Sequence, residues 1–247
     1  MNNPYDKLLA RKRTWTPVKT SKGQLKYGAE EAIHRALAIR IMELPVGSYI
    51  EEALEKDVPK AARDLLRSNV KDEERHDLAL NYAVDAHGKN EKADEELEEI
   101  ARQEEAERLR KAWDSHPDHT LNKALVAERA VFFVVLPFFR FCGDAGLRTI
   151  SADISRDEQI HVATNSLVCL DLGLRYSPSL DKLRKATVNW IFEPLKRSED
   201  RYLNKQFWMD QSDNLMYAGK TEGLQDTQRA RMPAFFETSN SDLPSYS

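Results

Sequence analysis

The sequence contains few glycines, few cysteines and no long hydrophobic run. Only nine of its 247 residues are glycine, which disfavours a sandwich or barrel built on many tight turns. Cys142 and Cys169 form no CxxC pair and lie in apolar segments, so we expect two buried thiols in a reducing cytoplasm. The most apolar stretch, residues 131–139, is too short to cross a bilayer, and no secretory signal opens the chain. We therefore expect a cytoplasmic protein without a membrane span.

An excess of positive charge is also missing. The chain has 37 Lys and Arg against 41 Asp and Glu, a net charge of −4, and the two signs are interspersed. Such a chain has no basic field to attract nucleic acid, so we do not expect nucleic acid as a primary partner. Charged residues make up 32% and hydrophobic residues 41%, which is typical of long solvated helices. The composition thus predicts an all-α protein.

Hydrophobic residues recur at steps of three and four through most of the chain, which predicts a single helical domain. The expected helices cover residues 28–44, 59–87, 92–113, 121–142, 144–172 and 179–210. The highly charged helix 92–113 is expected at the periphery, and the apolar helices 121–142 and 144–172 at the centre. The predicted organisation is an N-terminal arm (1–27), a helical bundle (28–210) and a flexible C-terminal tail (211–247).

Two of the expected helices carry the same spacing of a glutamate and a histidine. The pairs are Glu73-x-x-His76 and Glu158-x-x-His161. A spacing of three residues places both side chains on one helix face, one turn apart, so that each pair can hold a metal ion. A mixed set of carboxylates and imidazoles suits iron or manganese better than structural zinc, which prefers sulfur-rich sites.

Two further glutamates complete this pattern. Glu43 and Glu128 lie in apolar segments, where an unpaired charge would be costly. Glu43 precedes Glu73 by 30 residues, and Glu128 precedes Glu158 by 30 residues, the length of one helix and its return. The sequence therefore predicts a ferritin-like four-helix bundle that holds two metal ions between four carboxylates and two histidines, with extra peripheral helices.

A third match to the spacing, Glu31-x-x-His34, is assigned to the solvated face. About one such match is expected from this composition alone, so a single match carries little weight. Glu31 and Glu43 differ by about 120° around a helix of 3.6 residues per turn, and they cannot both face one site. The alternative for the remaining pairs is an accidental surface pattern, but their combination with two lone glutamates favours a metal site.

The segment that ends at His161 resembles the last metal-binding helix of ribonucleotide reductase small subunits, the radical-generating partner of that enzyme. It reads Arg-Asp-Glu-x-x-His after an apolar and a small residue, as the family pattern does. The resemblance is strong over residues 121–170 and fair over 28–87. It implies six metal ligands, namely Glu43, Glu73, His76, Glu128, Glu158 and His161. Family members commonly have Asp at the first of these positions, so Glu43 departs from the pattern.

The resemblance also implies roles outside the ligand set. Asp157 would orient His76 and fix its tautomer. Trp15 would belong to the family's radical relay; the alternative is a packing anchor for the N-terminal arm. Tyr217 or Tyr246 would be a relay tyrosine, although a surface tyrosine is the simpler interpretation of either.

Leu80 stands four residues after His76, where the tyrosyl-radical members carry a tyrosine. The resemblance therefore excludes a stable tyrosyl radical at the usual place. It implies an iron pair or a manganese–iron pair as the store of the oxidising equivalent, or a radical on another aromatic residue such as Tyr82. It further implies a homodimer and a large catalytic subunit as partner, docked through residues 218–247.

Two other functions remain open on the sequence alone. The ligand spacing is also similar to that of aldehyde-deformylating oxygenases, and Leu80 would leave room beside the metals for a small or lipid-like substrate. A stand-alone di-iron oxidase or oxygenase is thus the main alternative to a reductase small subunit that serves deoxyribonucleotide synthesis. An iron-storage bundle is disfavoured, because the central helices are apolar and mineral stores need polar ion paths.

Overall fold

The computed structural model describes residues 3–56, 58–87 and 93–217, and every regular element within them is helical. The α-helices are α1 (Pro4–Leu9), α2 (Glu30–Ala38), α3 (Glu43–Leu54), α4 (Arg63–His87), α5 (Ala93–Asp114), α6 (Thr120–Ala127), α7 (Phe133–Cys142), α8 (Ala145–Asp171), α9 (Pro178–Phe192) and α10 (Lys205–Tyr217). Short 3-10 segments are η1 (Ile39–Met42), η2 (Lys60–Ala62) and η4 (Arg201–Leu203), and η3 (Glu128–Phe132) is π-helical. The all-α prediction is confirmed for these residues.

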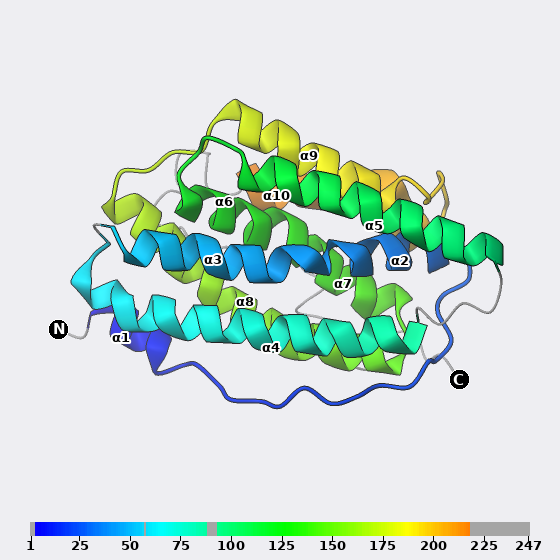
Figure 1. The fold of residues 1–247 in the computed structure, drawn as a ribbon, viewed down its shortest axis with the longest axis horizontal. Helices are drawn as coiled ribbons and strands as arrows, with labels where there is room; N and C mark the ends of the chain where they lie inside the picture. The colour runs from blue at the N-terminus through cyan, green and yellow to red at the C-terminus, as the bar shows by residue number, and fades with distance from the viewer. Residues whose placement is uncertain (1–2, 57, 88–92, 218–247) are drawn as a thin grey trace.

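Four helical segments pack side by side at the centre of the molecule (Figure 1). Helix α4 contacts α3 and α8, helix α6 contacts α3 and α8, and α7 continues from α6 through η3 and packs along α8. Helices α5, α9 and α10 cover the side of this group that faces away from α4. The segments expected to carry metal ligands are therefore direct neighbours.

Helix starts follow local capping chemistry. The Asp144 carboxylate accepts a hydrogen bond from the backbone N–H of Leu147 at 2.9 Å and begins α8. Ser177 caps α9 in the same way, and Pro178 occupies its first position, where the missing N–H has no intrahelical partner. Pro45 lies in the first turn of α3 for the same reason. The chain therefore continues helically past Pro45 to Leu54.

The predicted domain limits differ from the structure at both ends. The N-terminal arm contains the short helix α1, which Asn3 caps and Pro4 opens. The helical body extends beyond residue 210, because α10 continues to Tyr217 and buries Leu215 and Met216. The proposed docking tail, 218–247, lies outside the described residues.

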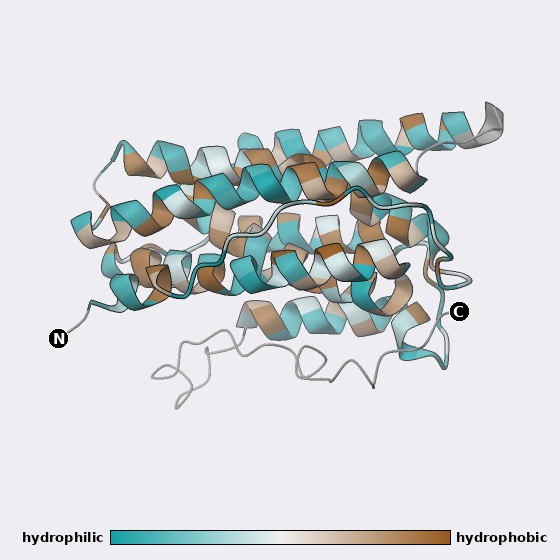
Figure 2. Ribbon diagram, turned by 90° about the horizontal axis from the view of Figure 1, so that it is seen from below, coloured by the Kyte–Doolittle hydropathy of each residue, from teal (hydrophilic) through white to brown (hydrophobic). Residues whose placement is uncertain are grey.

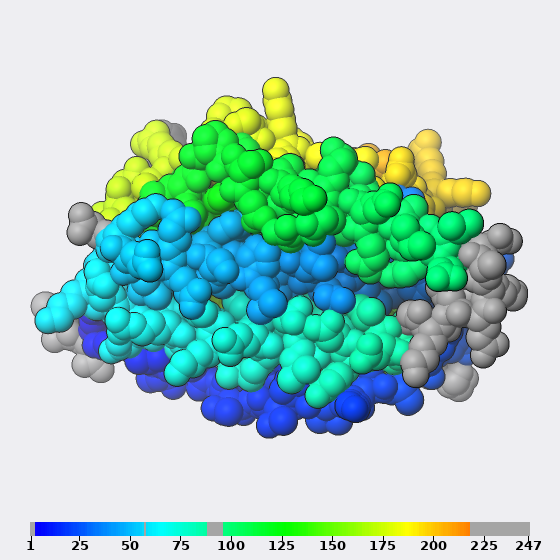
Figure 3. Space-filling view, viewed as in Figure 1, coloured from blue at the N-terminus to red at the C-terminus, as the bar shows by residue number. Residues whose placement is uncertain are grey.

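The rest of the N-terminal arm is an extended strap that crosses α4 and α8 (Figure 2). Figure 3 shows it packed along the edge of α4. The backbone N–H of Gly23 donates to the Asp144 carboxylate at 2.7 Å, and that of Lys26 donates to the carbonyl of Cys142 at 2.9 Å. A Cβ atom at position 23 would lie 2.8 Å from Cβ of Asp144, so the close approach requires glycine.

The core contains a cluster of aromatic side chains that joins α7, α9 and α10. The rings of Phe138, Phe192 and Trp208 lie 5.0 to 5.5 Å apart, centroid to centroid. Cys142 and Cys169 are both buried and free, and burial raises the pKa of each thiol to about 12. Over the described ranges, none of the helices combines the length and apolarity needed to cross a membrane.

Candidate metal centre

Six side chains converge in the middle of the bundle, and none is more than 1% exposed. They are Glu43, Glu73, His76, Glu128, Glu158 and His161. Helices α4 and α8 each supply one Glu-x-x-His pair, with the two side chains one turn apart on the inward face. The structure thus brings together the six residues that the sequence predicts as metal ligands.

The cluster has two ends and a shared middle. Nδ1 of His76 lies 3.8 Å from Glu43, and Nδ1 of His161 lies 3.7 Å from Glu128. Glu73 is shared, with its two oxygens 3.4 Å from His76 and 3.0 Å from His161. Glu158 is shared too, since its Oε1 lies 3.3 Å and 3.7 Å from the two Nδ1 atoms. Two of the four glutamates, Glu73 and Glu158, thus lie between the histidines, whereas Glu43 and Glu128 each lie beside one histidine.

The inward atoms of this cluster lack hydrogen-bond partners among the described residues. Both carboxylate oxygens of Glu43, Glu73 and Glu158 are buried without one. Oε1 of Glu128 and the Nδ1 atoms of His76 and His161 are also buried without a hydrogen-bond partner. Buried polar atoms are normally satisfied, and a cation at this point would satisfy all of these together. The donor set, of carboxylate oxygens and imidazole nitrogens, fits a metal ion; Glu73, His76, Glu158 and His161 by themselves could hold one.

The two lone glutamates lie at irregular points of their helices. Glu43 is the first residue of α3, directly after the 3-10 segment η1. Glu128 is the first residue of the π-helical segment η3, between α6 and α7. A π-helical turn shifts the angular position of its side chains relative to an α-helix, and such turns are frequent at functional sites. The oxygen of Glu128 that does not face the cluster's centre accepts a hydrogen bond from Asn165 at 2.7 Å.

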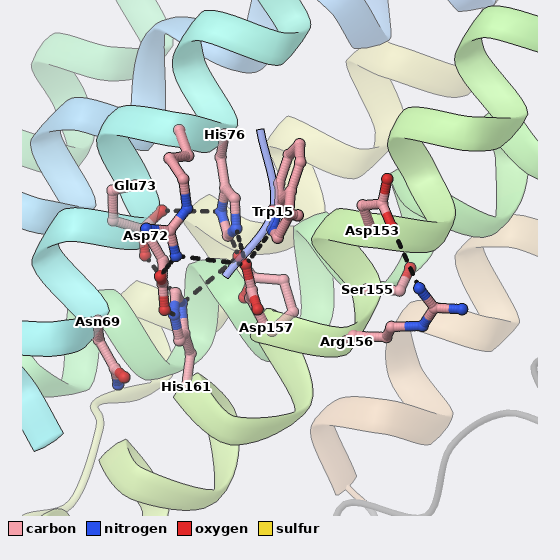
Figure 4. Close-up of polar contacts among 12 residues, drawn as sticks. Trp15, Asn69, Asp72, Glu73, His76, Asp153, Ser155, Arg156, Asp157 and His161 are labelled. Atoms are coloured by element: carbon pink, nitrogen blue, oxygen red, sulfur yellow. Dashed lines mark hydrogen bonds and ion pairs between the residues drawn. The ribbon is translucent and has the colours of Figure 1, made fainter. Parts of the chain in front are cut away.

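Each histidine contacts a carboxylate from the opposite helix (Figure 4). Nε2 of His76, on α4, lies 3.3 Å from Asp157, on α8. Nε2 of His161, on α8, lies 3.0 Å from Asp72, on α4. Each imidazole can therefore donate Nε2–H outward and present the Nδ1 lone pair inward, the form required of a metal ligand. Asp157 thus contacts the histidine that the sequence predicts.

The N-terminal arm contacts both outer carboxylates. Nε1–H of Trp15 donates to Asp157 at 2.7 Å, and the Trp15 ring lies 6.3 Å from that of His76. The ammonium of Lys12 contacts Asp72, and Arg75 forms an ion pair with the same carboxylate. The sequence did not predict the group formed by Lys12, Asp72 and Arg75. The signal for Asp72 was present, since Asp precedes Glu-x-x-His in both helices; nothing in the sequence pattern marks Lys12.

Burial dominates the electrostatics of the metal-free cluster. It raises the pKa of Glu73 and Glu128 well above the usual range, with Glu158 adding to the effect in both cases. Burial likewise raises the pKa of Glu158 to about 7. Burial would lower the pKa of His76, but its contacts with surrounding carboxylates outweigh this and raise it. For His161, burial and the positive charges of its neighbours lower the pKa. The metal-free cluster therefore retains protons that a metal ion would have to displace.

The third Glu-x-x-His pair lies away from the cluster. Glu31 forms ion pairs with Arg35 and Arg102, and His34 is half-buried between α2 and α5. Leu80 is buried on α4, one turn beyond His76.

Tyr82, the candidate radical site, and Tyr217, a candidate relay tyrosine, are also outside the cluster. Tyr82 is half-buried, with the ammonium of Lys19 at 5.8 Å from its ring. Tyr217 donates to Asp181 at 2.6 Å, at the end of α10. Tyr246 lies outside the described residues.

Over the residues that the structure describes, the protein is helical and contains a buried glutamate–histidine cluster that could hold metal ions. Comparisons with protein-family models and with curated proteins yield no match.

Replacing Asp157 with alanine is expected to weaken metal binding about 10- to 100-fold, because His76 would lose the acceptor that orients its ring. Titration of the metal-free protein with Mn²⁺ or, without oxygen, Fe²⁺ measures the effect. Asp153→Ala on the same helix is the matched control, since Asp153 forms its ion pair with the exposed Arg156 and not with a residue of the cluster. Equal metal affinity in Asp157→Ala and wild type would remove Asp157 from this role.

Proposed function

We propose that the chain is a ferritin-like dimetal-carboxylate protein that acts as a ribonucleotide reductase small subunit. It would activate an oxidant at an iron pair or a manganese–iron pair and pass the oxidising equivalent to a large catalytic subunit. The convergence of four glutamates and two histidines supports the dimetal part of this proposal. The resemblance around Glu158 and His161 supports the reductase part.

The connection from Trp15 through Asp157 to His76 is the observation that carries the proposal. It joins a half-buried aromatic side chain on the arm to a buried imidazole through two polar contacts, of 2.7 Å and 3.3 Å. A stand-alone oxygenase needs substrate access to its metals, but it needs no such link outward. Asp157, in the middle of this connection, also borders a surface cavity of about 470 Å³ that Arg11 and Arg13 line.

The chain's own residues would supply binding, orientation and exclusion of water. Glu43 and His76 would hold one ion, Glu128 and His161 the other, and Glu73 and Glu158 would contribute to holding both. When bound, the metals supply the redox chemistry that protein side chains lack. Leu80 keeps an apolar side chain beside His76, so no tyrosine takes up the oxidising equivalent at that position.

The proposed partner and the proposed homodimer rest on the resemblance to ribonucleotide reductase small subunits. Residues 218–247 would dock onto the large subunit, and two copies of the chain would form a homodimer. The alternative function is a stand-alone di-iron oxidase or oxygenase that acts on a small or lipid-like substrate. The lifetime of the oxidised state distinguishes the two functions.

The proposal predicts a long-lived oxidised state whose external reduction depends on Trp15. Protein loaded with iron, with manganese or with both is exposed to O₂ and followed by electron paramagnetic resonance. We expect no tyrosyl signal from the usual position and slow decay in at least one loading. A soluble one-electron donor should then reduce Trp15→Phe more slowly than wild type, because phenylalanine cannot donate to Asp157.

The control is Trp190→Phe, a half-buried tryptophan on α9. Rapid decay in all three loadings, accelerated by a fatty aldehyde, would instead support the oxygenase. Equal reduction rates in Trp15→Phe, Trp190→Phe and wild type would contradict the proposed relay.

A further inference from the structure

The side chain of Lys12 is largely enclosed although it belongs to an extended strap. Its side chain is 9% exposed, and its ammonium contacts Asp72 and donates to the Asn69 side chain at 2.8 Å. Asp72 and Asn69 are themselves at most 1% exposed. Lysine is almost never buried unless it is paired, so these contacts account for its position. The strap is therefore fastened directly to a carboxylate that orients a histidine of the cluster.

The charges around the cluster show what Lys12 contributes. The connected set has six carboxylates, those of Glu43, Glu73, Glu128, Glu158, Asp72 and Asp157. Among the described residues, the basic side chains that form ion pairs with this set are Lys12 and Arg75. With both imidazoles neutral, two divalent ions would supply the other four positive charges. Such a centre carries no net charge, which matters because a buried, unbalanced charge is costly.

We propose that Lys12 is a positioning residue of the metal centre, and that docking of the N-terminal arm and metal binding stabilise each other. The Lys12 ammonium holds Asp72 against Nε2 of His161 and completes the charge balance of the loaded centre. Three residues later, Trp15 contacts Asp157, so the strap reaches the outer carboxylates of both halves. The inference rests on the proposed metal centre but not on the reaction that the centre performs.

The direction in which metal affinity changes when Lys12 is replaced distinguishes a positioning role from simple charge repulsion. If Lys12 acted only as a nearby positive charge, it would repel metal ions, and its removal would tighten binding. If it completes and orients the centre, its removal weakens binding. Reciprocity applies as well, because two linked binding events must change each other's equilibrium by the same factor.

The first test is metal affinity in Lys12→Met, which keeps the chain length and removes the charge. We expect Mn²⁺ and anaerobic Fe²⁺ to bind about 10- to 100-fold more weakly than to wild type, as for other residues that orient a ligand. Lys12→Arg should recover part of the affinity, because it restores the charge. Lys22→Met is the matched control, an exposed lysine of the same strap. Circular dichroism confirms that each variant is folded.

The second test is proteolysis of the strap. Trypsin cleavage after Arg13, followed by mass spectrometry, should slow when Mn²⁺ is added to wild type or to Lys22→Met. It should respond much less in Lys12→Met. Equal or tighter metal binding in Lys12→Met, or strap cleavage that ignores Mn²⁺ in wild type, would overturn the role of Lys12 alone. Failure of wild type to bind metal would remove the proposed centre together with this inference.

Discussion

Glu158→Gln is expected to abolish binding of a metal pair while leaving the metal-free protein as stable as wild type, or more stable. Glu158 lies between both histidines, so both ions would lose a ligand oxygen with its charge. In the metal-free protein the same carboxylate is fully buried, and burial raises its pKa to about 7. Glutamine keeps the shape and hydrogen-bonding capacity of the side chain without a charge to bury.

Two measurements test the expected loss of metal binding and the expected gain or absence of change in the stability of the metal-free protein. Titration with Mn²⁺ gives the number of ions bound, and thermal unfolding with and without a chelator gives the stabilisation by metal. Wild type should gain stability from metal, whereas Glu158→Gln should not. Glu104→Gln, on the exposed face of α5, is the control. Two ions bound to Glu158→Gln with wild-type affinity would show that this residue is not a shared ligand.

Metal-free protein is expected to lose stability as the pH rises from about 6.5 to 8.5. Glu158 binds its proton more tightly in the folded chain than in the unfolded chain, where its pKa is close to the ordinary 4.5. Its contribution is fully present below the unfolded value and is lost as the pH rises through about 7. For this carboxyl the loss between pH 6.5 and 8.5 amounts to roughly 1 kcal/mol, because the larger part of its contribution is already lost between pH 4.5 and 6.5. Glu73 and Glu128 act in the same direction, since burial raises the pKa of both.

His161 acts in the opposite direction, but mainly at lower pH. Burial lowers its pKa below the ordinary 6.5, so its contribution is present above that value and is lost as the pH falls through the folded pKa. Denaturant unfolding of chelator-treated protein at several pH values between 6.5 and 8.5 therefore leaves His161 out; His76, whose pKa the surrounding carboxylates raise, acts in the same direction as the carboxyls. Glu158→Gln should flatten the profile. Metal affinity should rise over the same range, because fewer protons must be displaced. A profile that is flat in wild type would contradict the buried carboxyls.

The sequence predicted the helices and the convergence of the Glu-x-x-His pairs because both depend on local periodicity. A three-residue spacing gives one helix face wherever the helix lies in the fold. Glu43 and Glu128 were found by their apolar surroundings and by the equal distances to Glu73 and Glu158. Their helices, however, are irregular at these points, with a 3-10 turn before Glu43 and a π-helical segment at Glu128. Such interruptions have no simple signature in hydrophobic periodicity.

The contacts of the N-terminal arm could not be predicted, because they depend on tertiary structure alone. Nothing in the residues around Lys12 indicates that an extended segment will place it on Asp72, 60 positions further along the chain. The limit at residue 210 was misplaced for a related reason. Helix α10 has weak amphipathic character, and it is held by the burial of Leu215 and Met216 rather than by a strong local pattern.

The crossed contacts of the two aspartates bear on how such a centre could arise by gene duplication. Asp72 serves His161 and Asp157 serves His76, so each helix carries the acid that the other helix's histidine requires. An ancestral helix pair with a single Asp-Glu-x-x-His motif would have had no acid for its own histidine. Two identical copies, facing each other across a twofold axis, would have supplied it mutually. A symmetric dimer of half-chains is thus a workable ancestor, whereas a lone half-chain is not.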